Sequence, residues 1–236
     1  MRRWWPSDVR RRAYGRIARR ARRVHGTGPL LVAVGDSHTD PGTAYTLPWQ
    51  VWVRIVGRAG YKTLNLGVSG DTTSDMRARI VHALSEGQPE IVVLFGGSND
   101  PARIDLAQTE KNVTFMVEWL RSQGVARIVL IGPGLRNWTP DAAALAVPMD
   151  EVHGLLRDVA ERYELLFVDL VDFFRGRLER GEDPDFARTL YHQSRSWHVK
   201  DGDPHFNAYG QRLIAEAFLA ATADWRSPSA RVGNCR

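Results

Sequence analysis

The stretch Leu30-Leu31-Val32-Ala33-Val34-Gly35-Asp36-Ser37 joins an uninterrupted apolar run to a small polar turn. Five consecutive apolar residues are typical of a parallel β-strand that is buried on both faces of a sheet. Ser37 therefore follows the end of a predicted strand, where ligands bind in open α/β sheets. Its side chain is a candidate nucleophile, although a serine in this place is also a good cap for a helix.

Four further runs are short, rich in Val, Ile and Leu, and bounded by Gly, Asn or Asp: Lys62–Leu66, Ile91–Phe95, Arg127–Ile131 and Leu165–Leu170. The segments between and after the runs have helical spacing: Leu47–Ala59, Thr72–Glu86, Leu106–Gln123, Pro148–Tyr163 and Ala208–Trp225. This alternation predicts an α/β fold in which helices cover both faces of a parallel sheet. Two long irregular stretches, Gly132–Val147 and Gly181–Pro204, are candidate binding loops or surface decoration.

The composition is that of an ordinary globular chain. Its 236 residues are enough for one well-buried core. Of them, 43% are hydrophobic and 25% are charged, which is ordinary for a globular protein. No apolar run approaches the roughly 20 residues that a membrane-spanning helix needs. The single cysteine, Cys235, has no partner for an internal disulfide. We expect an arm at 1–27, one domain at 28–225 and a tail at 226–236.

The positive charge is concentrated in the arm. Residues 1–25 contain ten arginines and one acid, Asp8, and so carry +9. The whole chain carries +5, so residues 26–236 carry −4. The arm is expected to be solvated or partly disordered. The alternative is an arginine-coated helix that packs on the domain or contacts an acidic partner or an anionic surface. We do not expect nucleic-acid binding, because no recognition motif accompanies the charge. Without an apolar export signal, a cytoplasmic location is expected, with export as the alternative.

Three other blocks place polar residues after predicted strands or before the last helix. Gly67-Val68-Ser69-Gly70-Asp71-Thr72 follows the second strand, and Gly96-Gly97-Ser98-Asn99-Asp100 follows the third. Asp201-Gly202-Asp203-Pro204-His205 precedes the last helix. Taken singly, these blocks are explained as turns, helix caps and a structural histidine.

Taken together and in this order, the four blocks resemble the SGNH hydrolase (GDSL esterase/lipase) superfamily. The resemblance covers residues 30–220 and implies a flavodoxin-like, three-layer α/β/α fold with a five-stranded parallel sheet. The chain lacks the Gly-x-Ser-x-Gly elbow of the ordinary α/β-hydrolases.

The resemblance also implies a catalytic triad and an oxyanion hole. Ser37 would be the nucleophile and His205 its base. The oxyanion donors would be the backbone N–H groups of Ser37 and Gly70 and the side-chain amide of Asn99. Such donors, fixed in place beforehand, stabilise the tetrahedral oxyanion that forms when a serine attacks an ester.

The triad acid departs from the usual spacing. Most family members place it three residues before the histidine, where this chain has Gly202. A residue before proline favours extended backbone, in which residues two apart face the same side. Asp203 is therefore the predicted acid, and Asp201 is the alternative. Some members of the superfamily, such as alginate-acetylation enzymes, share this Asp-x-His spacing.

The predicted function is ester hydrolysis through an acyl-serine intermediate, with deacetylation as one form of it. The alternatives are acyl transfer at the same site, or a non-catalytic binding protein that acts through the arm. The substrate would be a small-molecule, carbohydrate or lipid acyl ester, and no cofactor is expected. A metal site is the alternative role for five residues of this region, but their spacing matches no regular helix or hairpin pair of ligands: His192, His198, Asp201, Asp203 and His205. Candidate pocket aromatics are Trp138, Tyr191, Trp197 and Phe206.

Overall fold

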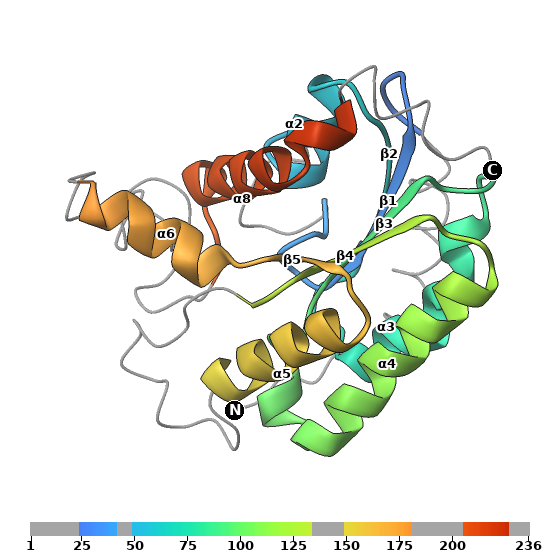
Figure 1. Cartoon of the computed structure of the whole chain (residues 1–236), viewed down its shortest axis with the longest axis vertical. Coiled ribbons are helices and arrows are strands. Elements are labelled where there is room, and N and C mark those ends of the chain that lie inside the picture. Colours follow the sequence, from blue (N-terminus) through green and yellow to red (C-terminus); the bar gives the residue numbers. More distant parts are fainter. Residues whose placement is uncertain (1–23, 42–48, 134–148, 181–204, 227–236) are drawn as a thin grey trace.

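A five-stranded parallel sheet forms the centre of the molecule (Figure 1). The structure, a computed structural model, describes residues 24–41, 49–133, 149–180 and 205–226. Its strands are β1 (Leu30–Gly35), β2 (Lys62–Gly67), β3 (Ile91–Phe95), β4 (Arg127–Ile131) and β5 (Leu166–Val168). They are ordered β2-β1-β3-β4-β5, so the chain builds outward from β1 in both directions. The predicted fold class is confirmed.

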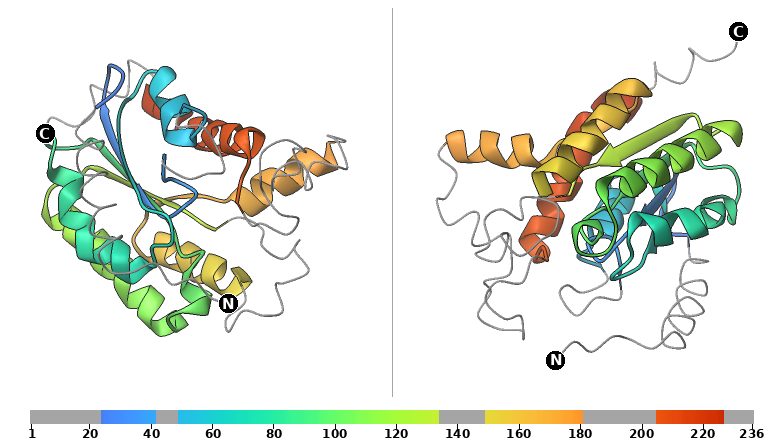
Figure 2. Two further views of the ribbon diagram at one scale, coloured as in Figure 1. Left: turned by 180° about the vertical axis from the view of Figure 1, so that it is seen from behind. Right: turned by 90° about the horizontal axis from the view of Figure 1, so that it is seen from below.

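Helices cover both faces of the sheet, which makes three layers (Figures 1 and 2). One face carries α2 (Trp52–Arg58) and α8 (Ala208–Ala221), and α6 (Leu170–Glu179) extends beside them. The other face carries α3 (Thr73–Arg79), α4 (Leu106–Ser122) and α5 (Met149–Arg162). Three short 3₁₀ turns complete the described part: Ile80–Leu84, Asp100–Ala102 and Ala223–Arg226.

The side chains of the strands alternate between two apolar cores. In β1, Leu31 and Ala33 pack on the α2/α8 side, whereas Val32 and Val34 pack on the α3/α4/α5 side. Both sets are fully buried. A strand that faces apolar helices on both sides needs an unbroken apolar sequence, which explains the run that opens the domain.

Side-chain caps set the helix boundaries and refine the predicted ones. Thr72 and Asp75 form a reciprocal capping box at the start of α3, and Asp105 accepts a hydrogen bond from Gln108 N (2.7 Å) at the start of α4. The predicted helix at 72–86 is in fact α3 followed by a 3₁₀ turn. The last strand, β5, is shorter than predicted because a helix begins directly after it. The carboxylate of Asp169 accepts a hydrogen bond from Asp172 N (2.9 Å) and starts α6, a helix that the periodicity does not predict.

None of the helices in the described residues is long and apolar enough to cross a bilayer. The predicted arm at 1–27 and tail at 226–236 lie almost wholly outside the described residues.

The strand register brings three loop starts to one edge of the sheet. Gly35, the last residue of β1, pairs with Gly67 of β2 on one side and with Phe95 of β3 on the other. A Cβ atom on Gly67 would stand 2.4 Å from both Asp40 N and Thr39 C, so the turn after β1 packs directly on this glycine. The segments after β1, β2 and β3 therefore leave the sheet side by side.

We predict that Gly67→Ala destabilises the protein by about 1–3 kcal/mol, because the backbone of residues 39–40 has to move away from the added methyl group. The control is Gly154→Ala in α5, where a Cβ meets nothing within 4 Å. It should stabilise the protein by about 0.5–1 kcal/mol. Urea unfolding followed by circular dichroism measures both, and equal effects would contradict the close approach.

Candidate active site

Ser37 lies in a tight turn directly after β1. Asp40 N donates to Asp36 O (3.0 Å), and the carboxylate of Asp36 accepts from His38 N (2.9 Å). Ser37 thus caps no described helix, and only 9% of it is exposed. The turn holds its hydroxyl at the carboxyl end of β1, and the strand order reverses beside it, between β1 and β3.

His205 meets this serine from the other end of the domain. Its Nε2 atom lies 2.9 Å from Ser37 Oγ, although the two residues are 168 positions apart in the chain. That distance suits a hydrogen bond through which the ring takes the hydroxyl proton. The pair of residues that the four sequence blocks predicted is therefore in contact.

Packing and capping just after His205 fix its position. The next residue, Phe206, is 1% exposed, and its ring lies 5.0 Å from the ring of His38 and 6.0 Å from that of Phe174. Asn207 caps α8 by accepting from Gly210 N (3.0 Å). Phe206 was one of the candidate pocket aromatics, and here it is a core residue that anchors the histidine.

Gln211 links the histidine segment to the serine turn, a role that the sequence pattern does not predict. Its amide nitrogen donates to His38 O (3.0 Å), and its amide oxygen accepts from Trp52 N (2.9 Å). The side chain is 3% exposed and joins α8, which carries the histidine segment, to the turn that carries Ser37. Its one indication in the sequence is its position one helical turn after the cap Asn207, on the same face of the helix.

Gly70 and Asn99 lie on the neighbouring loops at the same edge. Asn99 Nδ2 donates to the backbone oxygen of Asp71 (2.9 Å), so the loops after β2 and β3 are tied together beside Gly70. Gly70 has a φ of +82°, which favours glycine. Ser69 N donates to the carboxylate of Asp40 (3.0 Å) and ties the same loop to the turn that carries Ser37.

Several predicted residues lie outside the described residues: Asp201, Asp203, His192, His198, Trp138, Tyr191 and Trp197. The choice between Asp203 and Asp201 as the triad acid therefore stays a prediction. Within the ranges that the structure describes, no three His, Cys, Asp or Glu side chains group as metal ligands do.

Buried carboxylates gather at this edge, and burial raises the pKa of three of them, Asp36, Asp71 and Asp100. Burial raises the pKa of Asp36 to about 6, against the opposing effects of the His38 N–H, His205 and Ser98. Burial also raises the pKa of Asp71 to about 6, although Arg79 pairs with it (2.7 Å) and opposes the change. Burial likewise raises the pKa of Asp100, which accepts from Thr73 N (2.9 Å).

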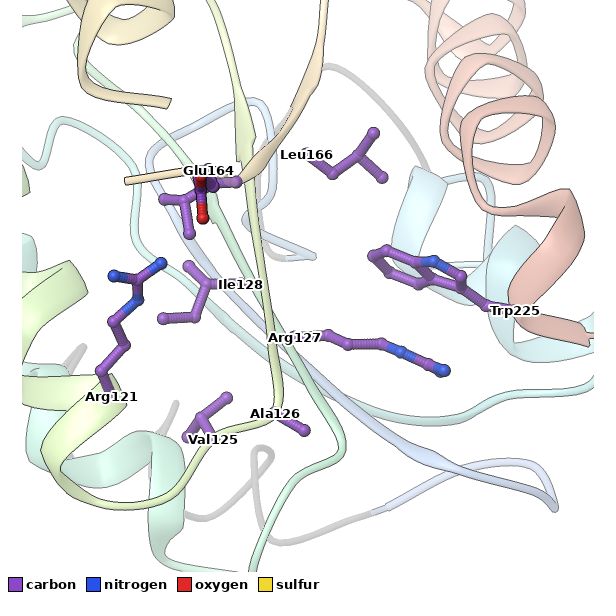
Figure 3. A pocket seen from close by; sticks show the side chains of 9 residues that line it. Arg121, Val125, Ala126, Arg127, Ile128, Glu164, Leu166 and Trp225 are labelled. Carbon is purple, nitrogen blue, oxygen red and sulfur yellow. The ribbon is translucent and has the colours of Figure 1, made fainter. Parts of the chain in front are cut away.

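A pocket at the opposite edge of the sheet is not part of this arrangement. It lies where β4 and β5 begin, between Arg121, Arg127, Glu164 and Trp225 (Figure 3). The guanidinium of Arg127 lies over the Trp225 ring, 4.8 Å from its centroid. The lining holds no Ser, Cys or His, so it offers none of the usual nucleophile and base pairs for acyl transfer.

The doubly wound sheet, with a serine and a histidine in contact just after the end of β1, is the arrangement of an ester hydrolase with an α/β fold. The model of the GDSL-like lipase/acylhydrolase family matches residues 33–213. The chain belongs to this family, which is also the SGNH superfamily that the sequence blocks predicted.

Individual relatives agree with this assignment. The chain is similar to an acetylxylan esterase of Geobacillus stearothermophilus, with 26% identity over 82% of this chain and 94% of the relative. It is also similar to the esterase TesA of Pseudomonas aeruginosa, with 36% identity over 43% of this chain and 53% of the relative. A solved lipase/acylhydrolase from Enterococcus faecalis shares the fold, with a TM-score of 0.65, 20% identity, and 85% of this chain and 98% of that one covered.

We predict that Asp36→Asn stabilises the protein at high pH and not at low pH. The folded protein keeps a proton on Asp36 between pH 3.8 and about 6, where the unfolded chain releases it. The ionised group therefore lowers the free energy of unfolding as the pH rises through this interval. Asparagine keeps the acceptor for His38 N, and it should add on the order of 1–3 kcal/mol at pH 8.

The measurement is urea unfolding at pH 8 and at pH 4, and the difference between variant and wild type should vanish at pH 4. The exposed Asp158 provides the matched control, Asp158→Asn, which should change little at either pH. A gain that is the same at both pH values would contradict a cost of burying charge at Asp36.

Proposed function

We propose that this protein hydrolyses esters through a covalent acyl-serine intermediate on Ser37. The observation that carries the proposal is the 2.9 Å contact between His205 Nε2 and Ser37 Oγ. In this mechanism His205 takes the hydroxyl proton as Oγ attacks the ester carbonyl, and then returns it to the departing alcohol. Water, activated by the same ring, releases the acid in the second half of the reaction.

The developing oxyanion would be held by the backbone N–H groups of Ser37 and Gly70 and by the Asn99 amide. The bond from Asn99 Nδ2 to Asp71 O supports this role, because it uses one amide hydrogen and orients the other. A donor that is already fixed loses no energy to reorganisation when charge develops, and each one typically contributes about 2.7–4 kcal/mol.

We further propose that short acyl esters of carbohydrates, acetyl esters above all, are the substrates. The similarity to the acetylxylan esterase extends over most of both chains, which supports this class before longer lipid esters. The similarity to TesA covers less than half of this chain and gives weaker support for any substrate.

We predict that Ser37→Ala abolishes hydrolysis of p-nitrophenyl acetate, with kcat reduced at least about 10⁴-fold, because it removes the hydroxyl that contacts His205 Nε2. The control is Ser122→Ala, which removes an exposed hydroxyl at the end of α4 and should keep full activity. Release of p-nitrophenol is followed by absorbance, and a fluorophosphonate should add its mass to the wild type alone. An active Ser37→Ala variant would refute the acyl-serine mechanism.

We predict that Asp203→Asn lowers kcat on the order of 10³–10⁴-fold, because the acid orients His205 and stabilises its charged form. Asp201→Asn should change kcat less than about tenfold. Stopped-flow measurement of acylation, with folding checked by circular dichroism, compares the two variants. A severe loss in Asp201→Asn with Asp203→Asn active would reverse the assignment of the acid.

A further inference from the structure

The guanidinium of Arg79 joins the segments that carry the proposed oxyanion donors. Arg79 is the last residue of α3 and is only 7% exposed. Its Nε donates to Asp71 Oδ2 (2.7 Å), its Nη2 to the backbone oxygen of Gly35 (2.7 Å), and its Nη1 to that of Leu66. One side chain therefore contacts the end of β1, the end of β2 and the loop after β2.

Each of these contacts adjoins a residue of the site. Gly35 precedes the turn that holds Ser37, and Asp71 directly follows Gly70. The backbone oxygen of Asp71 is also the acceptor that orients the Asn99 amide (2.9 Å). A chain of contacts thus runs from the guanidinium through Asp71 to Asn99, and a second runs through Gly35 toward Ser37.

We propose that Arg79 is a positioning residue that sets the three oxyanion donors at their working separation. The inference rests on the proposed acyl-serine mechanism and extends it to a residue that touches no substrate. Arg79 transfers no proton and holds no charge of the substrate. It acts by keeping the Ser37 turn, the Gly70 loop and the Asn99 amide in one rigid arrangement.

The chemistry of the guanidinium suits this task. It is planar, always charged and presents five N–H donors in a fixed geometry, so it can bind a carboxylate and two carbonyl oxygens at once. A lysine ammonium in the same place is a point charge on a flexible stem. The positive charge also offsets part of the cost of the buried Asp71, whose pKa rises with burial and is lowered by Arg79.

Contacts other than those of Arg79 anchor the start of α3. The start of α3 is held by the Thr72–Asp75 capping box. Thr73 N and its hydroxyl both bind the carboxylate of Asp100, at 2.9 and 2.5 Å. The contacts of Arg79 lie at the other end of α3, where they join the helix to the segments of the site.

The test compares Arg79→Met and Arg79→Lys with the wild type on p-nitrophenyl acetate. We expect Arg79→Met to lower kcat about 10–100-fold with KM changed less than about threefold, because the lost interaction acts in the transition state. Arg79→Lys should recover little of kcat. The control is Arg177→Met, which removes the ion pair with Glu216 (2.9 Å) between α6 and α8 and should leave kcat unchanged.

A double-mutant cycle with Asn99→Ala separates positioning from a general structural defect. If Arg79 acts through Asn99, Arg79→Met should cost several-fold less in kcat when Asn99 is already alanine. A defect unrelated to the oxyanion donors would cost the same factor in both backgrounds, which would overturn the proposal. Melting temperatures confirm that each variant is folded at the assay temperature.

If Arg79→Met does not fold, Asp71→Asn provides the second variant, because it weakens the charged contact with Arg79 and keeps the backbone oxygen that holds Asn99. Asp71→Asn should also lower kcat, and the loss should be several-fold smaller when Asn99 is already alanine. A folded variant of either kind with kcat within threefold of the wild type overturns the role of Arg79. A wild type that hydrolyses no ester instead refutes the proposed function, and the Arg79 role with it.

Discussion

The parallel register at Gly35 is the constraint on which the site depends. Hydrogen bonding holds this residue level with Gly67 of β2 and Phe95 of β3, so the three strands end together. A register shift of one residue in any of them would exchange the faces of its apolar side chains, and both cores would lose their packing. The hydrophobic effect that fixes the sheet therefore also fixes where the Ser37 turn and the two neighbouring loops begin.

The polar groups beneath this edge work against the stability of the same sheet. Asp36 and Asp71 are buried, and burial raises the pKa of each to about 6. Their ionised forms are costly near neutral pH, and among the described residues one guanidinium, that of Arg79, pairs directly with Asp71. Such strain is tolerated at functional sites because rigid, pre-oriented polar groups are what stabilises charge in a transition state.

Much of the fold could be predicted because its determinants are local. Continuous apolar runs identify the strands, and helical spacing with caps such as Thr72 and Asn207 identifies the helices. The apolar run that ends at Leu170 does not predict α6, because this helix begins at a hydrogen bond to the carboxylate of Asp169, which lies inside the run. Ser37 and His205 could be predicted because the sequence blocks that contain them resemble, in residue types and in order, those of the SGNH superfamily. Arg79 and Gln211 could not, since their importance comes from buried contacts with backbone oxygens that no pattern of residue types records.

The separation of Ser37 and His205 along the chain shows how two weak local preferences produce one precise contact. The turn at Ser37 is closed by local hydrogen bonds to Asp36, which do not involve His205. His205 is brought to it by Phe206 in the apolar core and by the Asn207 cap, neither of which touches the serine hydroxyl in the described contacts. Gln211 then joins the two segments through His38 O. The distance of 2.9 Å between the two reactive atoms is thus held by residues that take no part in the chemistry, which is why substitutions in this supporting layer should affect the rate more than substrate binding.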